Sequence, residues 1–156
     1  MERKKSRQSA DPATPELDSH AVLLVEDDSV LAGLWQTYLQ REGYQVDCCG
    51  TVADAEILLQ SNHYRLLIVD LFLREDGRIL EEGGVTLINR VRINSGFNRG
   101  DANRMAVLAV TGAPARSAGK FTAVASIENL TDGILHKPIR LEELGKEVKH
   151  LIELRG

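Results

Sequence analysis

The sequence predicts an α/β fold in which a five-stranded parallel sheet is covered by helices on both faces. Two observations carry this prediction. Short apolar runs alternate with longer segments whose apolar residues recur at helical spacing, and the alternation continues from residue 20 to the end of the chain. Strands separated by helices pair in parallel, and a parallel sheet needs cover on both sides. The length of 156 residues suits one domain, and 43% apolar residues are enough for a core.

The first half of the chain contains three expected strands and two expected helices. Apolar runs predict strands at about 21–26, 45–49 and 65–70. A one-sided apolar pattern predicts a helix at about 29–42, with Ser29 as its N-cap and Gly43 as the residue that ends it. The second helix is expected to open at Thr51, where Asp54 completes a near capping box.

The second half repeats the alternation with longer connections. After a loop, FLREDGRILEEGG, the pattern predicts a helix at about 84–94, a polar loop NSGFNRGDANR, a strand MAVLAVT, a strand at about 133–136 and a helix at about 141–154. Residues 112–131 are expected to hold a loop and one more helix. Five such units favour a doubly wound, flavodoxin-like sheet of order 2-1-3-4-5.

Residues 1–19 are predicted to be a flexible tail, and residues 20–156 the folded domain, because the tail is polar and lacks periodicity. No apolar segment follows its basic start, and no stretch approaches 18 apolar residues, so neither a secretory signal nor a membrane span is expected. A net charge of −4 argues against nucleic acid as the main partner. Cys48 and Cys49 would point to opposite faces of a strand, which favours two reduced cysteines in a cytoplasmic protein.

Charged and polar residues stand where the expected strands end. Glu26 and Asp27 end the first strand, Asp70 the third, Thr111 the fourth and Lys137 the last. Because doubly wound folds bind ligands outside the carboxyl ends of their strands, these side chains are expected to meet at one edge.

The chemistry of this set favours phosphoryl transfer. Carboxylates brought close together repel one another, and a divalent cation relieves the repulsion. Oxygen ligands and incomplete coordination favour Mg²⁺. Lys137 can neutralise a further anion and Thr111 can donate a hydrogen bond to it, so Asp70 is the expected nucleophile.

At this point the chain resembles the receiver domains of bacterial two-component response regulators. The matching motifs are LLVEDD, LLIVDL, AVLAVTG and ILHKP, and the resemblance spans about residues 20–154. It implies that Asp70 accepts a phosphoryl group from a phosphohistidine and that Thr111 and Lys137 assist. It also implies a cis Lys137–Pro138 bond and a Mg²⁺ site made by Glu26, Asp27, Asp70 and the backbone carbonyl of Phe72.

The implied partner is a histidine kinase or a histidine phosphotransfer protein. The resemblance also implies that the receiver domain catalyses its own phosphorylation and slow dephosphorylation and has no external substrate. Only a residue or two follow the last expected helix, so we expect no DNA-binding domain of its own and a signal that leaves through protein contacts or onward transfer. The downstream target and the formation of a homodimer stay open.

Three alternatives belong to other classes. A receiver-fold binding module that works without phosphorylation is disfavoured by the intact acidic set. An aspartate-nucleophile phosphatase would need an Asp where Phe72 stands. A flavin-binding protein would need a phosphate loop where Glu26 and Asp27 would repel a phosphate.

The chain departs from the receiver pattern in three places. Arg74 stands where receivers usually have a proline, and the loop before Gly84 is longer than usual. A tolerated insertion is favoured for this loop over a lid that gates hydrolysis. Ile134 occupies a position that is often aromatic, and the segment at 112–131 looks extended.

Two residues near the first expected helix have structural interpretations. Asp28 is expected to supply a favourable charge at the start of that helix rather than a metal ligand. Trp35 is expected to pack against the sheet.

Overall fold

The computed structural model describes residues 20–75, 78–79, 83–93, 96–112 and 127–155. Its main sheet has five parallel strands in the order β2-β1-β3-β6-β7, which confirms the predicted order. The strands are β1 (Ala21–Val25), β2 (Gln45–Cys49), β3 (Leu66–Asp70), β6 (Ala106–Thr111) and β7 (Gly133–His136). The helices are α2 (Ser29–Arg41), α3 (Val52–Ser61), α4 (Gly83–Ile93) and α6 (Leu141–Arg155), with short 3₁₀ turns η1 (Phe97–Gly100) and η2 (Ala102–Arg104).

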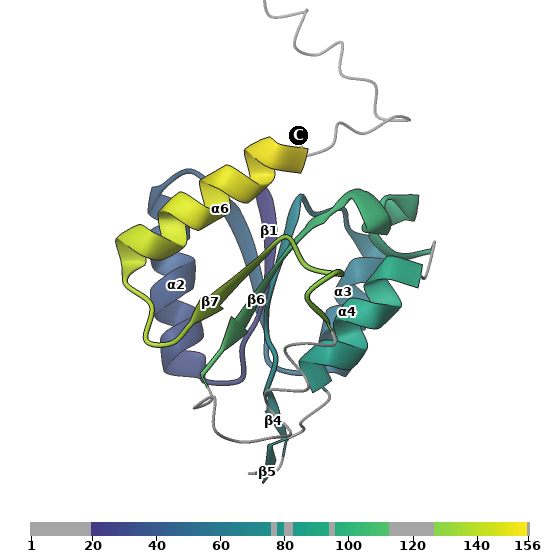
Figure 1. The fold of residues 1–156 in the computed structure, drawn as a ribbon, viewed down its shortest axis with the longest axis horizontal. Coiled ribbons are helices and arrows are strands. Elements are labelled where there is room, and N and C mark those ends of the chain that lie inside the picture. Colours follow the sequence, from purple (N-terminus) through teal and green to yellow (C-terminus); the bar gives the residue numbers. More distant parts are fainter. Residues whose placement is uncertain (1–19, 76–77, 80–82, 94–95, 113–126, 156) are drawn as a thin grey trace, which may run out of the picture.

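The sheet separates two apolar layers. Helices α2 and α6 cover one face and α3 and α4 cover the other (Figure 1). Successive residues of β1 alternate between the layers: Leu24 packs in the layer of Trp35, whereas Leu23 packs in the layer of Leu59 and Leu87. Trp35 is 1% exposed, which confirms its predicted place in the core.

Two expected segments lie outside the described residues. The predicted tail at 1–19 is one of them, and residues 113–126 of the segment expected to hold the additional helix are the other. No helix among the described residues is long and apolar enough to cross a membrane.

The helix caps correct one detail of the sequence prediction. Asp28, and not Ser29, is the N-cap of α2, because its Oδ1 accepts hydrogen bonds from the N–H groups of Val30 and Leu31 at 3.1 Å each. Its backbone is extended, as an N-cap requires, and Ser29 is already the first helical residue. Thr51 caps α3 through the N–H of Asp54, as expected.

Both segments interpreted as loops contain ordered structure. In the first, β4 (Arg74–Glu75) and β5 (Arg78–Ile79) pair as an antiparallel hairpin. In the second, the buried side chain of Asn98 accepts from the N–H of Tyr64 at 2.6 Å and donates to its carbonyl at 2.9 Å. These two hydrogen bonds attach η1 to the segment that leads into β3, the strand that carries Asp70.

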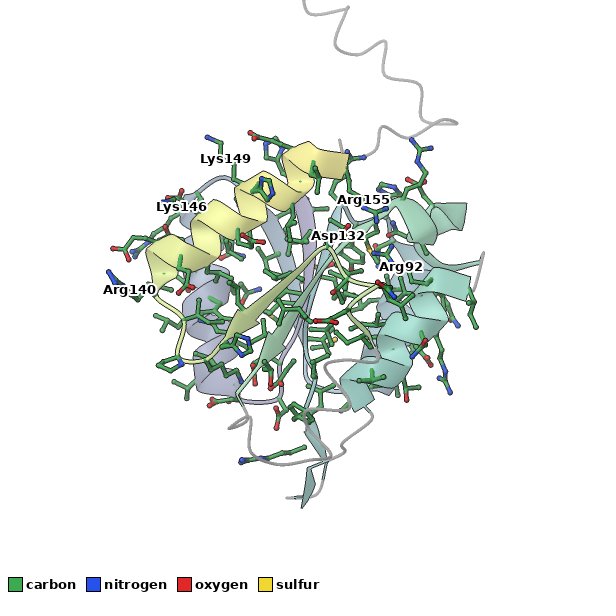
Figure 2. The ribbon with its side chains drawn as sticks, in the orientation of Figure 1. Arg92, Asp132, Arg140, Lys146, Lys149 and Arg155 are labelled. Carbon is green, nitrogen blue, oxygen red and sulfur yellow. The ribbon has the colours of Figure 1, made fainter. Side chains whose placement is uncertain are left out.

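A partly buried ion network joins α4 to α6 at the opposite end of the sheet from the carboxyl strand ends. Asp132 Oδ2 accepts from Arg92 Nη2 at 3.1 Å and from the N–H of Val107 at 2.8 Å. Its Oδ1 lies 2.9 Å from Arg155 Nη2. Figure 2 labels Arg92 on α4, Asp132 near it and Arg155 at the end of α6. The network therefore holds α4, β6 and α6 together.

The two cysteines are free thiols, as predicted. Burial raises the pKa of Cys48 to about 11 and that of Cys49 to about 12. Both side chains therefore stay protonated and weakly nucleophilic at neutral pH.

Candidate functional site

The three predicted acids meet at the carboxyl edge of the sheet. Glu26 and Asp27 follow β1, Asp70 ends β3, and these two strands are neighbours in register. One carboxylate oxygen from each of the three lies within 4.8 Å of the others. Glu26 is 3% exposed and Asp70 is 6% exposed, so most of this charge is held away from water.

Lys137 brings the positive charge to the same place. Its Nζ lies 2.8 Å from Glu26 Oε1 and 3.0 Å from Asp70 Oδ2. Its backbone is anchored where its N–H donates to the carbonyl of Thr111 at 2.8 Å, and its peptide bond to Pro138 is cis, as the resemblance implied. A Cβ on Gly112 would lie 3.0 Å from Lys137 Cδ, so the glycine leaves room for the lysine stem.

Each carboxylate also accepts a backbone hydrogen bond. The N–H of Asp28 donates to Glu26 Oε2 at 3.1 Å, and the N–H of Phe72 donates to Asp70 Oδ1 at 2.9 Å. The N–H of Arg74 donates to Asp27 Oδ2 at 3.3 Å. These contacts fix the orientation of the carboxylates before any ligand arrives.

Burial and charge shift the proton affinities of the site. Burial raises the pKa of Glu26 to about 6, a shift that the nearby ammonium of Lys137 opposes and the charge of Asp70 reinforces. Burial also works against the ammonium of Lys137, but its close contacts with the charged Glu26 and Asp70 outweigh this effect and raise the pKa of Lys137 above the usual 10.5. Lys137 is therefore charged at neutral pH.

The other two predicted residues lie beside the cluster. Thr111 ends β6, the strand between β3 and β7, and is 3% exposed. Phe72 lies two residues after the end of β3 and is 7% exposed, and its N–H donates to Asp70 Oδ1. The structure thus brings all the predicted site residues to one edge.

Sequence reasoning missed Gly84 as part of this edge. A Cβ at Gly84 would lie 2.4 Å from the carbonyl oxygen of Asp70 and 2.7 Å from Leu71 Cα, both backbone atoms. Only glycine lets the start of α4 approach the end of β3 this closely. The pair of glycines that ends the long loop was the available signal.

The donor set fits a divalent cation. Three carboxylates contribute −3 and Lys137 contributes +1, which leaves a formal charge of −2 at the cluster. All the acidic donors are oxygens, which hard cations such as Mg²⁺ prefer. The residues present are therefore compatible with Mg²⁺.

The fold is that of a doubly wound α/β domain, and its carboxyl edge carries an acidic cluster that fits a divalent cation. A family model described as response regulator receiver domain matches residues 22–149, and the chain belongs to that family. This confirms the resemblance that the four motifs indicated.

Curated relatives of the chain are longer than it is. The transcriptional regulatory protein PmrA of Pectobacterium parmentieri is 35% identical over 131 residues, which cover 84% of this chain and 51% of the relative. The transcriptional regulatory protein AruR of Pseudomonas aeruginosa is 30% identical, with 84% and 48% covered. The chain thus spans about half the length of the curated relatives it matches.

Solved structures share the fold. A putative response regulator from Chloroflexus aurantiacus is 26% identical with a TM-score of 0.66, covering 86% of this chain and 98% of that one. The receiver domain of sensor histidine kinase PA1611 from Pseudomonas aeruginosa has a TM-score of 0.69 at 20% identity, covering 86% and 98% of the two chains, and carries a coordinated magnesium ion. At that identity the second likeness shows the fold alone.

Proposed function

We propose that Asp70 is the phosphoacceptor of this receiver domain and takes its phosphoryl group from the phosphohistidine of a histidine kinase or a histidine phosphotransfer protein. The observation that carries the proposal is the position of Lys137 Nζ, 3.0 Å from Asp70 Oδ2. An ammonium at this distance can stabilise the negative charge on a carboxylate oxygen while the carboxylate forms an acyl phosphate. Membership of the receiver family supports the same role.

The reaction forms one bond and breaks one. A carboxylate oxygen of Asp70 attacks phosphorus while the P–N bond of the phosphohistidine breaks, and the bonding electrons stay on the imidazole nitrogen. The N–H of Phe72 holds Asp70 Oδ1 in place, and Lys137 offsets negative charge on the transferred group. We further propose that Thr111 donates a hydrogen bond to the bound phosphoryl group, whose added charge of about −1.5 to −2 would attract it.

We propose Mg²⁺ as the cofactor, with Glu26, Asp27, Asp70 and the backbone carbonyl of Phe72 as its protein ligands. The formal charge of −2 at the cluster and its oxygen donors support this assignment. The magnesium ion in the PA1611 receiver domain, which shares the fold, supports it as well. When bound, Mg²⁺ would neutralise charge on the transferring oxygens.

The test is direct phosphorylation of the full chain. The protein is incubated with Mg²⁺ and acetyl phosphate, a small phosphoryl donor, and its intact mass is followed. We expect a gain of one phosphoryl group that Asp70→Ala abolishes, that excess chelator prevents, and that Asp54→Asn on the exposed start of α3 retains. A wild-type chain that gains no mass under these conditions would contradict the proposal and favour a binding module that works without phosphorylation.

A further inference from the structure

Asp27 is held in a different way from the other two carboxylates. Lys137 Nζ contacts Glu26 and Asp70, and the backbone donors to these two acids lie two residues further along the chain. The donor to Asp27 is the N–H of Arg74, which is 47 residues away in sequence. Among the backbone contacts described for the cluster, this one joins the loop after β1 to the loop after β3.

The amide of Arg74 is itself held in place from both sides. On its N-terminal side, Leu73 is 1% exposed and Leu71 is fully buried, so the chain leading to Arg74 is fixed in the core. On its C-terminal side, the hairpin begins at once, because Arg74 pairs with Ile79. Arg74 is exposed, and its backbone N–H makes the contact with the cluster.

We propose that the backbone N–H of Arg74 is a positioning group for the cation site, because it holds Asp27 at the distance from Asp70 that a shared metal ion requires. A carboxylate has two oxygens, so one can accept the amide while the other binds a cation. A hydrogen bond to a ligand in this way orients it and limits its motion. The β4–β5 hairpin then contributes to metal affinity through its first residue, and not only to the shape of the edge. The inference rests on the proposed Mg²⁺ site.

The test separates the amide of Arg74 from its side chain. Arg74→Pro removes both the N–H and the guanidinium, whereas Arg74→Ala removes only the guanidinium and its charge. Mg²⁺ affinity of the full chain is measured by isothermal titration calorimetry. We expect Arg74→Pro to bind Mg²⁺ more weakly than Arg74→Ala, with a ratio of dissociation constants on the order of ten.

Two further measurements keep the interpretation specific. Thermal unfolding in metal-free buffer reports whether Arg74→Pro is folded. A folded variant that binds Mg²⁺ weakly supports the positioning role. The dissociation constants of the Pro and Ala variants are compared only below the melting temperature of Arg74→Pro. In an Asp27→Asn background, measured at high Mg²⁺, the difference between Pro and Ala at position 74 should shrink to about twofold or less, since the amide acts through the carboxylate.

The outcomes distinguish the inference from the proposed function. If the wild-type chain does not bind Mg²⁺, the cation site itself fails. If the wild-type chain binds Mg²⁺ and the Pro and Ala variants bind it equally well, only the role of the amide is overturned. Tighter binding by Arg74→Pro would also overturn it, because the amide would then compete with the ion for Asp27.

Discussion

Lys137 Nζ lies 2.8 Å from Glu26 Oε1, although the two residues follow strands that are not neighbours. Strands β3 and β6 separate β1 from β7, so the lysine side chain reaches across the carboxyl ends of these two strands. One ammonium thereby joins the first and last segments of the site. In the absence of a metal ion, it is the positive charge that offsets the two most buried acids.

Replacing Lys137 by Met should therefore destabilise the metal-free protein. Two nearly buried carboxylates would lose their shared cation, and we expect a loss of about 1–3 kcal/mol in the free energy of unfolding at pH 7. Protonation of Glu26 in the variant would remove one of the two uncompensated charges and so limit this loss. Added Mg²⁺ should restore more stability to this variant than to the wild type, because the ion supplies the missing positive charge. Urea unfolding with and without Mg²⁺ measures both effects.

The matched control is Lys149→Met, since Lys149 is an exposed lysine on α6. We expect it to change the free energy of unfolding by less than about 0.5 kcal/mol. Equal stability of Lys137→Met and the wild type in metal-free buffer would show that the ammonium does not stabilise the cluster.

The raised pKa of Glu26 predicts that the metal-free protein loses part of its stability as the pH rises. Burial lifts this pKa from 4.5 to about 6, so between these values the native state binds more protons than the unfolded state. The contribution of Glu26 is therefore complete below pH 4.5 and lost as the pH passes 6. At about 1.36 kcal/mol per pKa unit, this rise corresponds to up to about 2 kcal/mol in the free energy of unfolding.

The measurement is urea unfolding of the wild type and Glu26→Gln from pH 4.5 to pH 7 in metal-free buffer. The difference in free energy, wild type minus variant, should fall across this range, while Lys137 stays charged because its pKa is raised. Mg²⁺ should reverse the trend for the wild type, since it binds the ionised carboxylate. A difference that stays constant or grows without metal would mean that Glu26 is not protonated more readily in the native state.

Gly84 should tolerate no larger side chain. A Cβ there would lie 2.4 Å from the carbonyl oxygen of Asp70, and a backbone atom cannot swing aside as a flexible side chain can. We expect Gly84→Ala to cost about 1–3 kcal/mol and to slow phosphorylation by acetyl phosphate, because the end of β3 must shift. Thermal unfolding and intact mass report the two effects.

Gly33 is the matched control, because it lies within α2 and a Cβ would meet nothing within 4 Å. Gly33→Ala should stabilise the protein by about 0.5–1 kcal/mol, since alanine has the better helix propensity. If both substitutions had the same effect, the close approach at Gly84 would have no energetic consequence.

The three central strands were predictable because they show their burial locally. The residues of β1, of β3 before Asp70 and of β6 before Thr111 are apolar in unbroken runs, as strands covered on both faces must be, whereas β2 and β7 are only partly buried. The order of strands was confirmed. The N-cap of α2 was placed one residue late because Asp28 and Ser29 are both good caps, and backbone angles decide between them. The bonds between Asn98 and Tyr64 span 34 residues, so no local pattern could reveal them.

The residues of the site could be predicted from the sequence, but the backbone contacts that hold them in place could not. Parallel strands bring their carboxyl ends to one edge, so Asp70 and Lys137 could be paired without coordinates. Arg74 was visible as a departure from the receiver pattern, but its amide contact with Asp27 depends on how two loops pack. Such contacts arise from tertiary structure, and residue type carries no signal for a backbone donor.

Asp132 should be among the most costly acids to neutralise, although it lies far from the site. Asp132 and Arg92 are each 10% exposed, and the carboxylate also accepts from the N–H of Val107 at 2.8 Å. Asp132→Asn would leave the largely buried guanidinium of Arg92 without its counter-charge and would turn an amide donor toward another donor. We expect a loss of about 3 kcal/mol in urea unfolding. By contrast, Glu56→Gln removes the partner of Arg90, which is 53% exposed, and should cost less than about 1 kcal/mol. Similar losses in the two variants would mean that burial does not strengthen the Asp132 network.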